Sequence, residues 1–237
     1  LQKTGDYETS IELLKTALAK LNYGIGRKNL ARAYYVASVM EKRKLNFINA
    51  AKYKLKLLQS GYNPAEFIPE IGRFNHAPTV AAILDDFGKR GLSLRDERGG
   101  RTALHFAALD SNLETARVLV GLGADIQAVD EVGLTAVFSA AQNNDVEMLK
   151  LFVANGTDIN KKSAQFGSTP LHTAALYGSI AAADFLLSQG ADINAASKDR
   201  ITPLVNAMQS GNLAMAKFLV AHNADLTIRI MGDASLK

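Results

Sequence analysis

The side chains best suited to chemistry in this sequence are its four histidines, His76, His105, His172 and His222. An imidazole can serve as an acid, a base or a metal ligand near neutral pH. Catalysis also requires a nucleophile and an orienting group within reach of that imidazole, and the spacing along the chain supplies neither. The sequence therefore predicts no catalytic histidine and no metal site.

Two glycine-containing stretches fall short of phosphate-binding loops. Residues 24–26 read Gly-Ile-Gly, but Asn29 stands where a dinucleotide loop has its third glycine. Lys89 follows Gly88 but precedes Arg90 rather than the serine or threonine of a phosphate loop. The sequence therefore predicts no cofactor-binding residue.

The remaining catalytic candidates are carboxylates and thiols. Asp85 and Asp86 are adjacent, so on a helix they point about 100° apart and form a solvated face rather than an acid–base pair. Cysteine is absent, which excludes disulfides, thiol nucleophiles and thiolate metal sites and fits a reducing compartment. We expect no catalytic residue, and we expect a cytoplasmic location. The chain begins at Leu1 rather than at a methionine, which indicates a trimmed or processed fragment whose signal peptide, if any, was lost.

Charge is unevenly distributed along the 237 residues. The net charge is +4, but residues 1–60 carry a balance of +8 and residues 61–237 a balance of −4. A basic segment of this kind suits a solvated helix surface, or contact with nucleic acid or anionic lipid. No apolar run reaches the roughly 20 residues that a membrane-spanning helix needs.

Two of the histidines belong to a sequence motif that recurs about every 33 residues. Residues 169–175 read Thr-Pro-Leu-His-Thr-Ala-Ala, and residues 190–194 read Gly-Ala-Asp-Ile-Asn. Variants of the first phrase begin at Thr102, Thr135 and Thr202, in steps of 33, 34 and 33 residues. Over residues 97–229 this pattern closely resembles the ankyrin repeat. The resemblance implies an all-α solenoid of helix pairs joined by hairpin loops, which binds proteins and rarely catalyses reactions. It also implies structural roles for His105 and His172, which stand at the motif position where the imidazole ties neighbouring turns together by hydrogen bonds.

Local physical chemistry agrees with that implied fold. Thr169 is a helix N-cap, Pro170 fits the first helical turn, and Gly178 suits a left-handed end to the helix. One repeat cannot bury both of its faces, so stability must come from stacking. Some repeats depart from the motif, with Phe138 and Val205 in place of the histidine, Ala136 in place of the proline, and Arg200 in place of the turn glycine. We expect these second and fourth repeats to be the less regular ones.

Weaker patterns flank the four repeats. We interpret residues 1–62 as an α-helical N-terminal cap, residues 63–96 as a degenerate ankyrin-like repeat, residues 97–229 as four repeats, and residues 230–237 as the start of a truncated fifth. The apolar spacing from Thr79 predicts an amphipathic helix as far as Gly91. Gly91, Gly123, Gly156 and Gly190 should each follow a helix end.

The partner-binding surface is expected on the concave face that the resemblance implies, which is lined by hairpin tips and first helices. Several residues at positions that should face solvent there are apolar or aromatic, and such clusters mark interaction sites. Phe166, Tyr177, Leu134 and Leu176 are expected to form one contiguous patch. The predicted partner-binding residues are Arg101, Phe106, Leu109, Leu134, Phe166, Leu176, Tyr177 and Ile201.

Two functions compete at this point. The first is a non-catalytic module that binds a partner protein through its concave face. The alternative is a regulatory or targeting fragment, such as a bacterial effector or a toxin-neutralising protein, whose basic helical cap contacts nucleic acid or anionic membrane. Binding through the cap should weaken steeply with salt, which separates the two.

Overall fold

The computed structural model describes residues 68–73 and 77–227, so the expected cap at residues 1–62 and the C-terminal residues 230–237 lie outside the described part. The described residues contain helices and no strand. None of these helices is long and apolar enough to cross a membrane. The fold is an all-α ankyrin-type solenoid.

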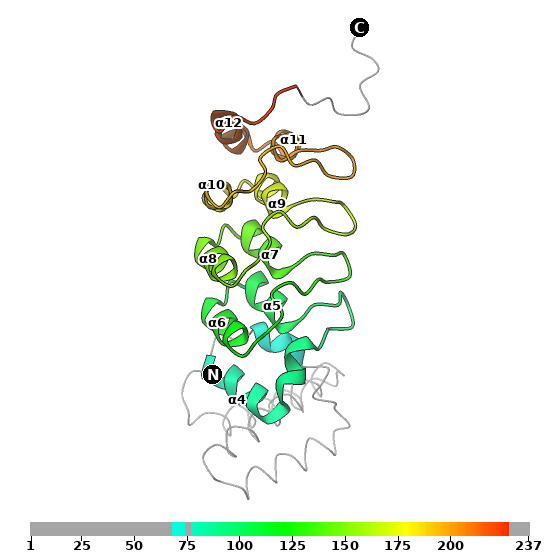
Figure 1. Ribbon diagram of the computed structural model, residues 1–237, viewed down its shortest axis with the longest axis vertical. Coiled ribbons are helices and arrows are strands. Elements are labelled where there is room, and N and C mark those ends of the chain that lie inside the picture. Colours follow the sequence, from blue (N-terminus) through cyan, green and yellow to red (C-terminus); the bar gives the residue numbers. More distant parts are fainter. Residues whose placement is uncertain (1–67, 74–76, 228–237) are drawn as a thin grey trace, which may run out of the picture.

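Eight helices form four stacked pairs. We call α5, α7, α9 and α11 the inner helices and α6, α8, α10 and α12 the outer helices; each inner helix and the outer helix after it form repeats 1 to 4 in chain order. The two kinds form separate rows, and the hairpins project beside the inner row (Figure 1). Their bounds are α5 Ala103–Leu109, α6 Leu113–Gly121, α7 Ala136–Gln142, α8 Val146–Ala154, α9 Pro170–Tyr177, α10 Ile180–Ser188, α11 Pro203–Gln209 and α12 Leu213–Ala221.

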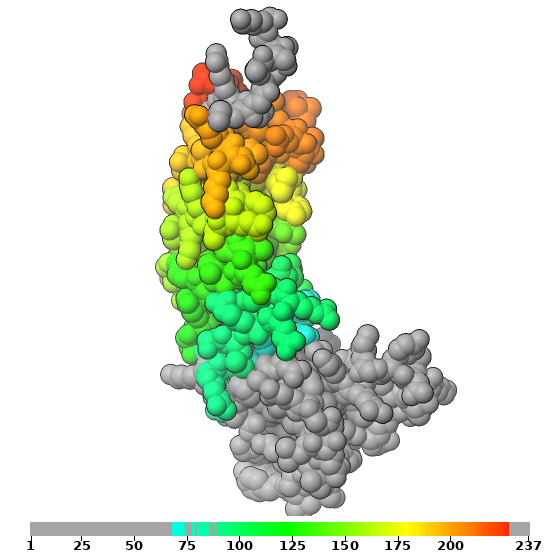
Figure 2. Space-filling model, turned by 90° about the vertical axis from the view of Figure 1, so that its right-hand side faces the viewer, coloured from blue at the N-terminus to red at the C-terminus, as the bar shows by residue number. Residues whose placement is uncertain are grey.

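Stacking stabilises helices that are too short to be stable alone. Each has 7 to 9 residues, whereas isolated helices shorter than about 12 residues are marginal in water. Every outer helix places one large side chain fully inside the core at the same position, and every inner helix buries paired or single alanines that let neighbours approach closely. The equivalent outer-helix residues are Leu119, Phe152, Leu186 and Leu219. Figure 2 shows the resulting column, with the repeats following one another in sequence order.

The hairpins stack through positions that require glycine. Gly100, Gly133 and Gly167 have positive φ angles of 65°, 82° and 67°, which glycine adopts without strain. A Cβ on Gly133 would stand 2.4 Å from the backbone nitrogen and the Cβ of Ala164 in the next hairpin, so close approach demands glycine as well. Backbone hydrogen bonds then join the tips: Glu131 N–H donates to Gly99 O (2.9 Å), Gln165 N–H to Val132 O (3.2 Å) and Lys198 N–H to Phe166 O (2.9 Å).

The segment before repeat 1 differs from the expected single helix over residues 79–91. Helix α4 spans Ala77–Phe87 and ends at Gly88, whose φ of 87° breaks the helix. The 3₁₀ helix η3 (Lys89–Ser93) follows, so Gly91 lies inside a helix and the prediction that it follows a helix end is wrong. Gly123, Gly156 and Gly190 do follow helix ends, as predicted. A second 3₁₀ helix, η2 (Ile68–Arg73), packs against α5, and α4 packs against α6.

Repeats 2 and 4 are as regular as the others in their helices, contrary to expectation. Their inner helices α7 and α11 have the same length as α5, because the cap and the buried apolar side chains set the helix bounds. The departures appear in hydrogen bonding instead. Thr135 Oγ1 is buried without a hydrogen-bond partner beside Phe138's helix turn, where repeats 1 and 3 place a histidine nitrogen.

Candidate functional site

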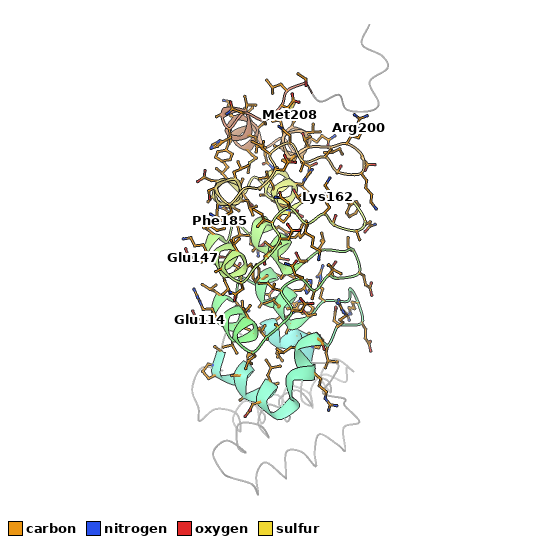
Figure 3. The ribbon with its side chains drawn as sticks, viewed as in Figure 1. Glu114, Glu147, Lys162, Phe185, Arg200 and Met208 are labelled. Carbon is orange, nitrogen blue, oxygen red and sulfur yellow. The ribbon has the colours of Figure 1, made fainter. Side chains whose placement is uncertain are left out.

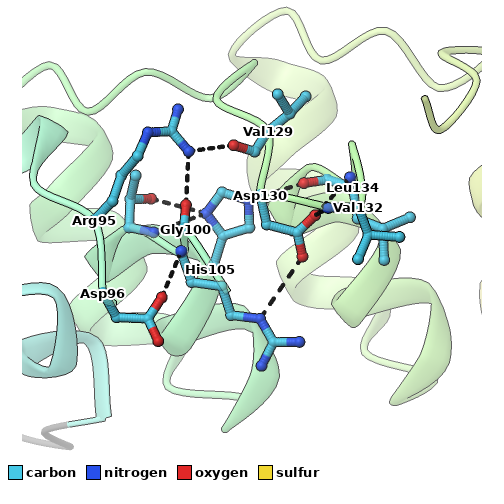
Figure 4. Close-up of polar contacts among 10 residues, drawn as sticks. Arg95, Asp96, Gly100, His105, Val129, Asp130, Val132 and Leu134 are labelled. Carbon is cyan, nitrogen blue, oxygen red and sulfur yellow. Dashed lines mark hydrogen bonds and ion pairs between the residues drawn. The ribbon is translucent and has the colours of Figure 1, made fainter. Parts of the chain in front are cut away.

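The two motif histidines form identical networks in repeats 1 and 3. His105 Nδ1 accepts from the backbone N–H of Thr102 at 3.2 Å, and its Nε2 lies 3.0 Å from the carbonyl oxygen of Leu134 (Figure 4). In repeat 3 the backbone N–H of Thr169 lies 3.1 Å from His172 Nδ1, and the Ile201 carbonyl lies 3.0 Å from Nε2. A carbonyl only accepts and an amide N–H only donates, so each neutral imidazole carries its proton on Nε2.

Both ring nitrogens of each histidine therefore take part in structural hydrogen bonds. Each imidazole satisfies the cap of its own helix and binds the backbone that leads into the next repeat, which ties neighbouring repeats together. Burial lowers the pKa of both His105 and His172 below the ordinary 6.5, although the hydrogen bond to the Leu134 or Ile201 carbonyl opposes that shift. Neutral, fully bonded histidines cannot shuttle protons or bind a metal without breaking the stack.

Charged side chains near His105 form hydrogen bonds and an ion pair that stabilise the hairpin turn. Asp130 Oδ1 accepts from the backbone N–H groups of Val132 (3.0 Å) and Leu134 (2.9 Å). Arg101 Nε lies 3.7 Å from the other oxygen of that buried carboxylate. Arg95 donates to the carbonyls of Gly100 and Val129 and so joins two hairpins (Figure 4). Arg101, a predicted partner-binding residue, therefore already has an intramolecular role.

The remaining histidines do not build a site either. His222 is exposed, with Nδ1 2.8 Å from the Phe218 carbonyl and Nε2 3.9 Å from Asp184. His76 lies outside the described residues. Within residues 68–73 and 77–227, no group of three His, Asp or Glu side chains is placed to hold a metal ion.

The concave surface of repeat 1 is closed, which corrects the prediction for Phe106. Phe106 is 4% exposed, so it cannot face a partner. The guanidinium of Arg73 lies 4.4 Å from the centre of its ring and forms an ion pair with Asp110 at 3.0 Å. Leu109 is half-buried. An arginine contributed by η2 thus covers the inner helix of repeat 1.

The concave surface of repeat 3 is open. Phe166 at the hairpin tip is 51% exposed, and Leu176 and Tyr177 at the end of α9 are 43% and 55% exposed. Leu134 and Ile201 are half-buried, and Leu134 packs against the core, so the four-residue patch expected from the sequence is reduced to three exposed members. We call Phe166, Leu176 and Tyr177 the repeat 3 patch.

Two lysines near the repeat 3 patch were not singled out from the sequence. Lys198 donates its backbone N–H to Phe166 O and its Nζ to Ala164 O at 2.5 Å, which holds it beside the tip that carries Phe166. Lys162 Nζ donates to Ala196 O at 2.7 Å and lies among the hairpins in Figure 3. Both side chains are exposed. They stand at different positions of their hairpins, since Lys198 aligns with Gln165 and Lys162 aligns with Ala196, so no shared sequence signal marks the two lysines.

Similarity to known proteins agrees with this geometry. Residues 137–230 match the family described as ankyrin repeats (3 copies), and residues 104–153 match ankyrin repeats (many copies). An ankyrin repeat protein of Rickettsia felis is 32% identical over 145 residues, 60% of this chain and 45% of that protein. Protein PhlB of Serratia liquefaciens is 36% identical over 104 residues, 43% of this chain and 46% of that protein.

A third relative shows how widely the repeat is used. Human neurogenic locus notch homolog protein 1 is 30% identical over 129 residues, 53% of this chain but 5% of that protein. The chain therefore spans less than half the length of each of these three relatives. Ankyrin repeats generally mediate protein–protein interaction. The two family matches together cover residues 104–230, and the chain belongs to the ankyrin repeat family.

Proposed function

We propose that this chain is a non-catalytic module that binds a partner protein through the concave face of its ankyrin stack, centred on repeat 3. The observation that carries the proposal is the repeat 3 patch: three large apolar or aromatic side chains exposed on one repeat. Exposed aromatic residues at a rigid surface are typical anchors of protein interfaces. The buried histidines contribute by holding that surface rigid, which lowers the entropic cost of binding.

Charge indicates what the partner offers to this surface. Lys162 lies on the same hairpin as Phe166, and Lys198 lies on the next hairpin, where its backbone N–H donates to Phe166 O. A partner segment with apolar residues flanked by aspartate or glutamate would match the patch and its rim. Such charges mainly accelerate association and select among partners, while the apolar contacts supply affinity.

Alanine substitution of the patch tests the proposal. The partner is first captured with the wild-type chain from the source organism and identified, and its affinity is then measured by calorimetric titration. Phe166→Ala combined with Tyr177→Ala should weaken binding at least about tenfold, as expected for the loss of two interface anchors, and should leave Tm nearly unchanged. Leu122→Ala is the matched control, because Leu122 is 40% exposed and directly follows the outer helix α6.

The basic N-terminal segment supplies the competing hypothesis. The triple substitution Lys52→Ala, Lys54→Ala and Lys56→Ala removes part of the +8 balance of residues 1–60. If this variant lost binding while the aromatic variant kept it, the concave-face proposal would be wrong. A regulatory or targeting fragment that contacts nucleic acid or anionic membrane would then be favoured, and its binding should fall steeply with salt.

A further inference from the structure

Repeat 4 ends the described stack with an apolar surface. We call this surface the end face; it consists of Met208, Leu213, Val220 and Leu226, which are 64%, 65%, 43% and 70% exposed. At the equivalent positions of repeats 1 to 3 the side chains are buried or half-buried, so the following repeat covers them. Those equivalents are Ala108, Ala141 and Ala175; Leu113, Val146 and Ile180; Val120, Val153 and Leu187; Ile126, Ile159 and Ile193.

Two residues of repeat 4 obstruct a further repeat of the same kind. Arg200 takes the place of the tip glycines and has a φ of 61°. A Cβ at Gly133 or Gly167 would lie 2.4 or 2.9 Å from the next hairpin, so the real Cβ of Arg200 blocks the same approach. Met208 takes the place of the second motif alanine, where inner helices pack closely in repeats 1 to 3. Figure 3 shows both residues in repeat 4, at the end of the stack.

A third difference is weaker. Val205 replaces the histidine that bonds the next repeat in repeats 1 and 3. Repeat 2 also lacks that histidine, at Phe138, and repeat 3 still stacks on it. The loss of the histidine alone does not prevent stacking, so the obstruction rests on Arg200 and Met208.

An exposed end face forgoes stabilisation, because large apolar side chains that stay in water do not gain the free energy of burial. A solenoid ordinarily ends in a polar surface for this reason. We infer that residues 228–237 of the same chain bind the end face as a non-repeat cap. This differs from the expectation that residues 230–237 begin a fifth repeat, which the obstruction at Arg200 and Met208 opposes.

The cap has the composition and reach that the end face requires. Residues 228–237 read Ile-Arg-Ile-Met-Gly-Asp-Ala-Ser-Leu-Lys, which supplies four large apolar side chains for four exposed ones. The segment begins two residues after Leu226, which belongs to the end face. Ten extended residues reach about 33 Å, and the nine-residue helix α12 is about 13 Å long. The covalent tether also gives the segment a local concentration in the millimolar range.

Engineered cysteines test this inference directly, because the chain contains no native cysteine. Ile230→Cys is combined with Val220→Cys in one full-length variant and with Leu213→Cys in another. The matched control combines Ile230→Cys with Leu122→Cys, an exposed apolar position in repeat 1. A disulfide forms only when the two Cα atoms come within about 7 Å. We expect an intramolecular disulfide in at least one end-face pair at micromolar protein, and none in the control.

Stability measurements give an independent test. Leu213→Gln with Leu226→Gln should lower Tm by at least about 3 °C if the end face is covered, because two buried apolar contacts are lost. Leu122→Gln should leave Tm unchanged. An unchanged Tm for the end-face variant, or monomers without a disulfide in both end-face pairs, would overturn the inference. Disulfides found only between two chains would also overturn it and assign the end face to a second copy of the protein.

Discussion

The inner helices of repeats 1 and 3 begin with the same cap but differ in which apolar side chains are covered. In both, a threonine and a neutral histidine share a network that reaches the next repeat. In repeat 1, Arg73 from outside the repeat covers Phe106 and pairs with Asp110. In repeat 3 the position of Asp110 is occupied by Tyr177, which is exposed. The capping network is therefore common to these two repeats, and single residues decide which of the two leaves apolar side chains exposed.

The largest losses of unfolding free energy should come from substitutions of the buried side chains that the repeats have in common. Leu119→Ala and Leu186→Ala remove equivalent, fully buried side chains from α6 and α10. Each should cost about 2–5 kcal/mol of unfolding free energy, through lost burial and the cavity left behind. Urea denaturation followed by circular dichroism measures both. A difference between them as large as the cost itself would show that the repeats are not equivalent in packing.

The motif histidines should contribute less. His105→Phe and His172→Phe introduce the residue that repeat 2 carries at Phe138, which conserves most of the volume. Each should cost about 1–3 kcal/mol, because the backbone N–H of the capping threonine and the carbonyl of the next repeat lose their partners. The same denaturation series measures the loss. Equal losses at both sites are expected from their matching distances.

Lowering the pH should reduce the unfolding free energy of the wild-type protein through the same two histidines. Burial lowers the pKa of His105 and His172 in the folded chain below 6.5. The unfolded chain therefore takes up protons first, so this stability is complete above about pH 6.5 and is lost as the pH falls through the lowered pKa. Unfolding free energies measured from pH 7.5 to pH 5 should decline in the wild type. The double variant His105→Phe/His172→Phe should decline less; an identical slope would contradict the neutral state assigned to both imidazoles.

The smallest effect is expected at the arginine that closes repeat 1. Arg73→Ala removes a partly exposed ion pair and a cation–π contact, so it should cost about 0.5–1 kcal/mol. A double-mutant cycle with Asp110→Ala isolates the ion pair. Partner affinity should stay unchanged, because Arg73 lies over repeat 1. A clear loss of affinity would move the binding site towards repeat 1.

The sequence alone predicted the helix pairs and their caps better than it predicted which apolar side chains are exposed. The phase of the motif predicts the four helix pairs, the caps at Thr169 and Gly178, and the structural use of His105 and His172, because these depend on nearby residues. The closure of Phe106 depends on Arg73, which comes from a segment where the repeat pattern is weak. The exposure of Met208 depends on the absence of a following inner helix in the described residues, which its own helix does not encode.

Hydroxyl-radical footprinting of the chain with and without its captured partner tests the central claim most directly. The method measures how fast each side chain is oxidised by solvent radicals, and Phe166, Leu176 and Tyr177 are all exposed. We expect the partner to slow oxidation of these three several-fold and to leave Leu122 unchanged. Unchanged rates at Phe166 and Tyr177, with protection confined to residues 1–60, would contradict binding through repeat 3.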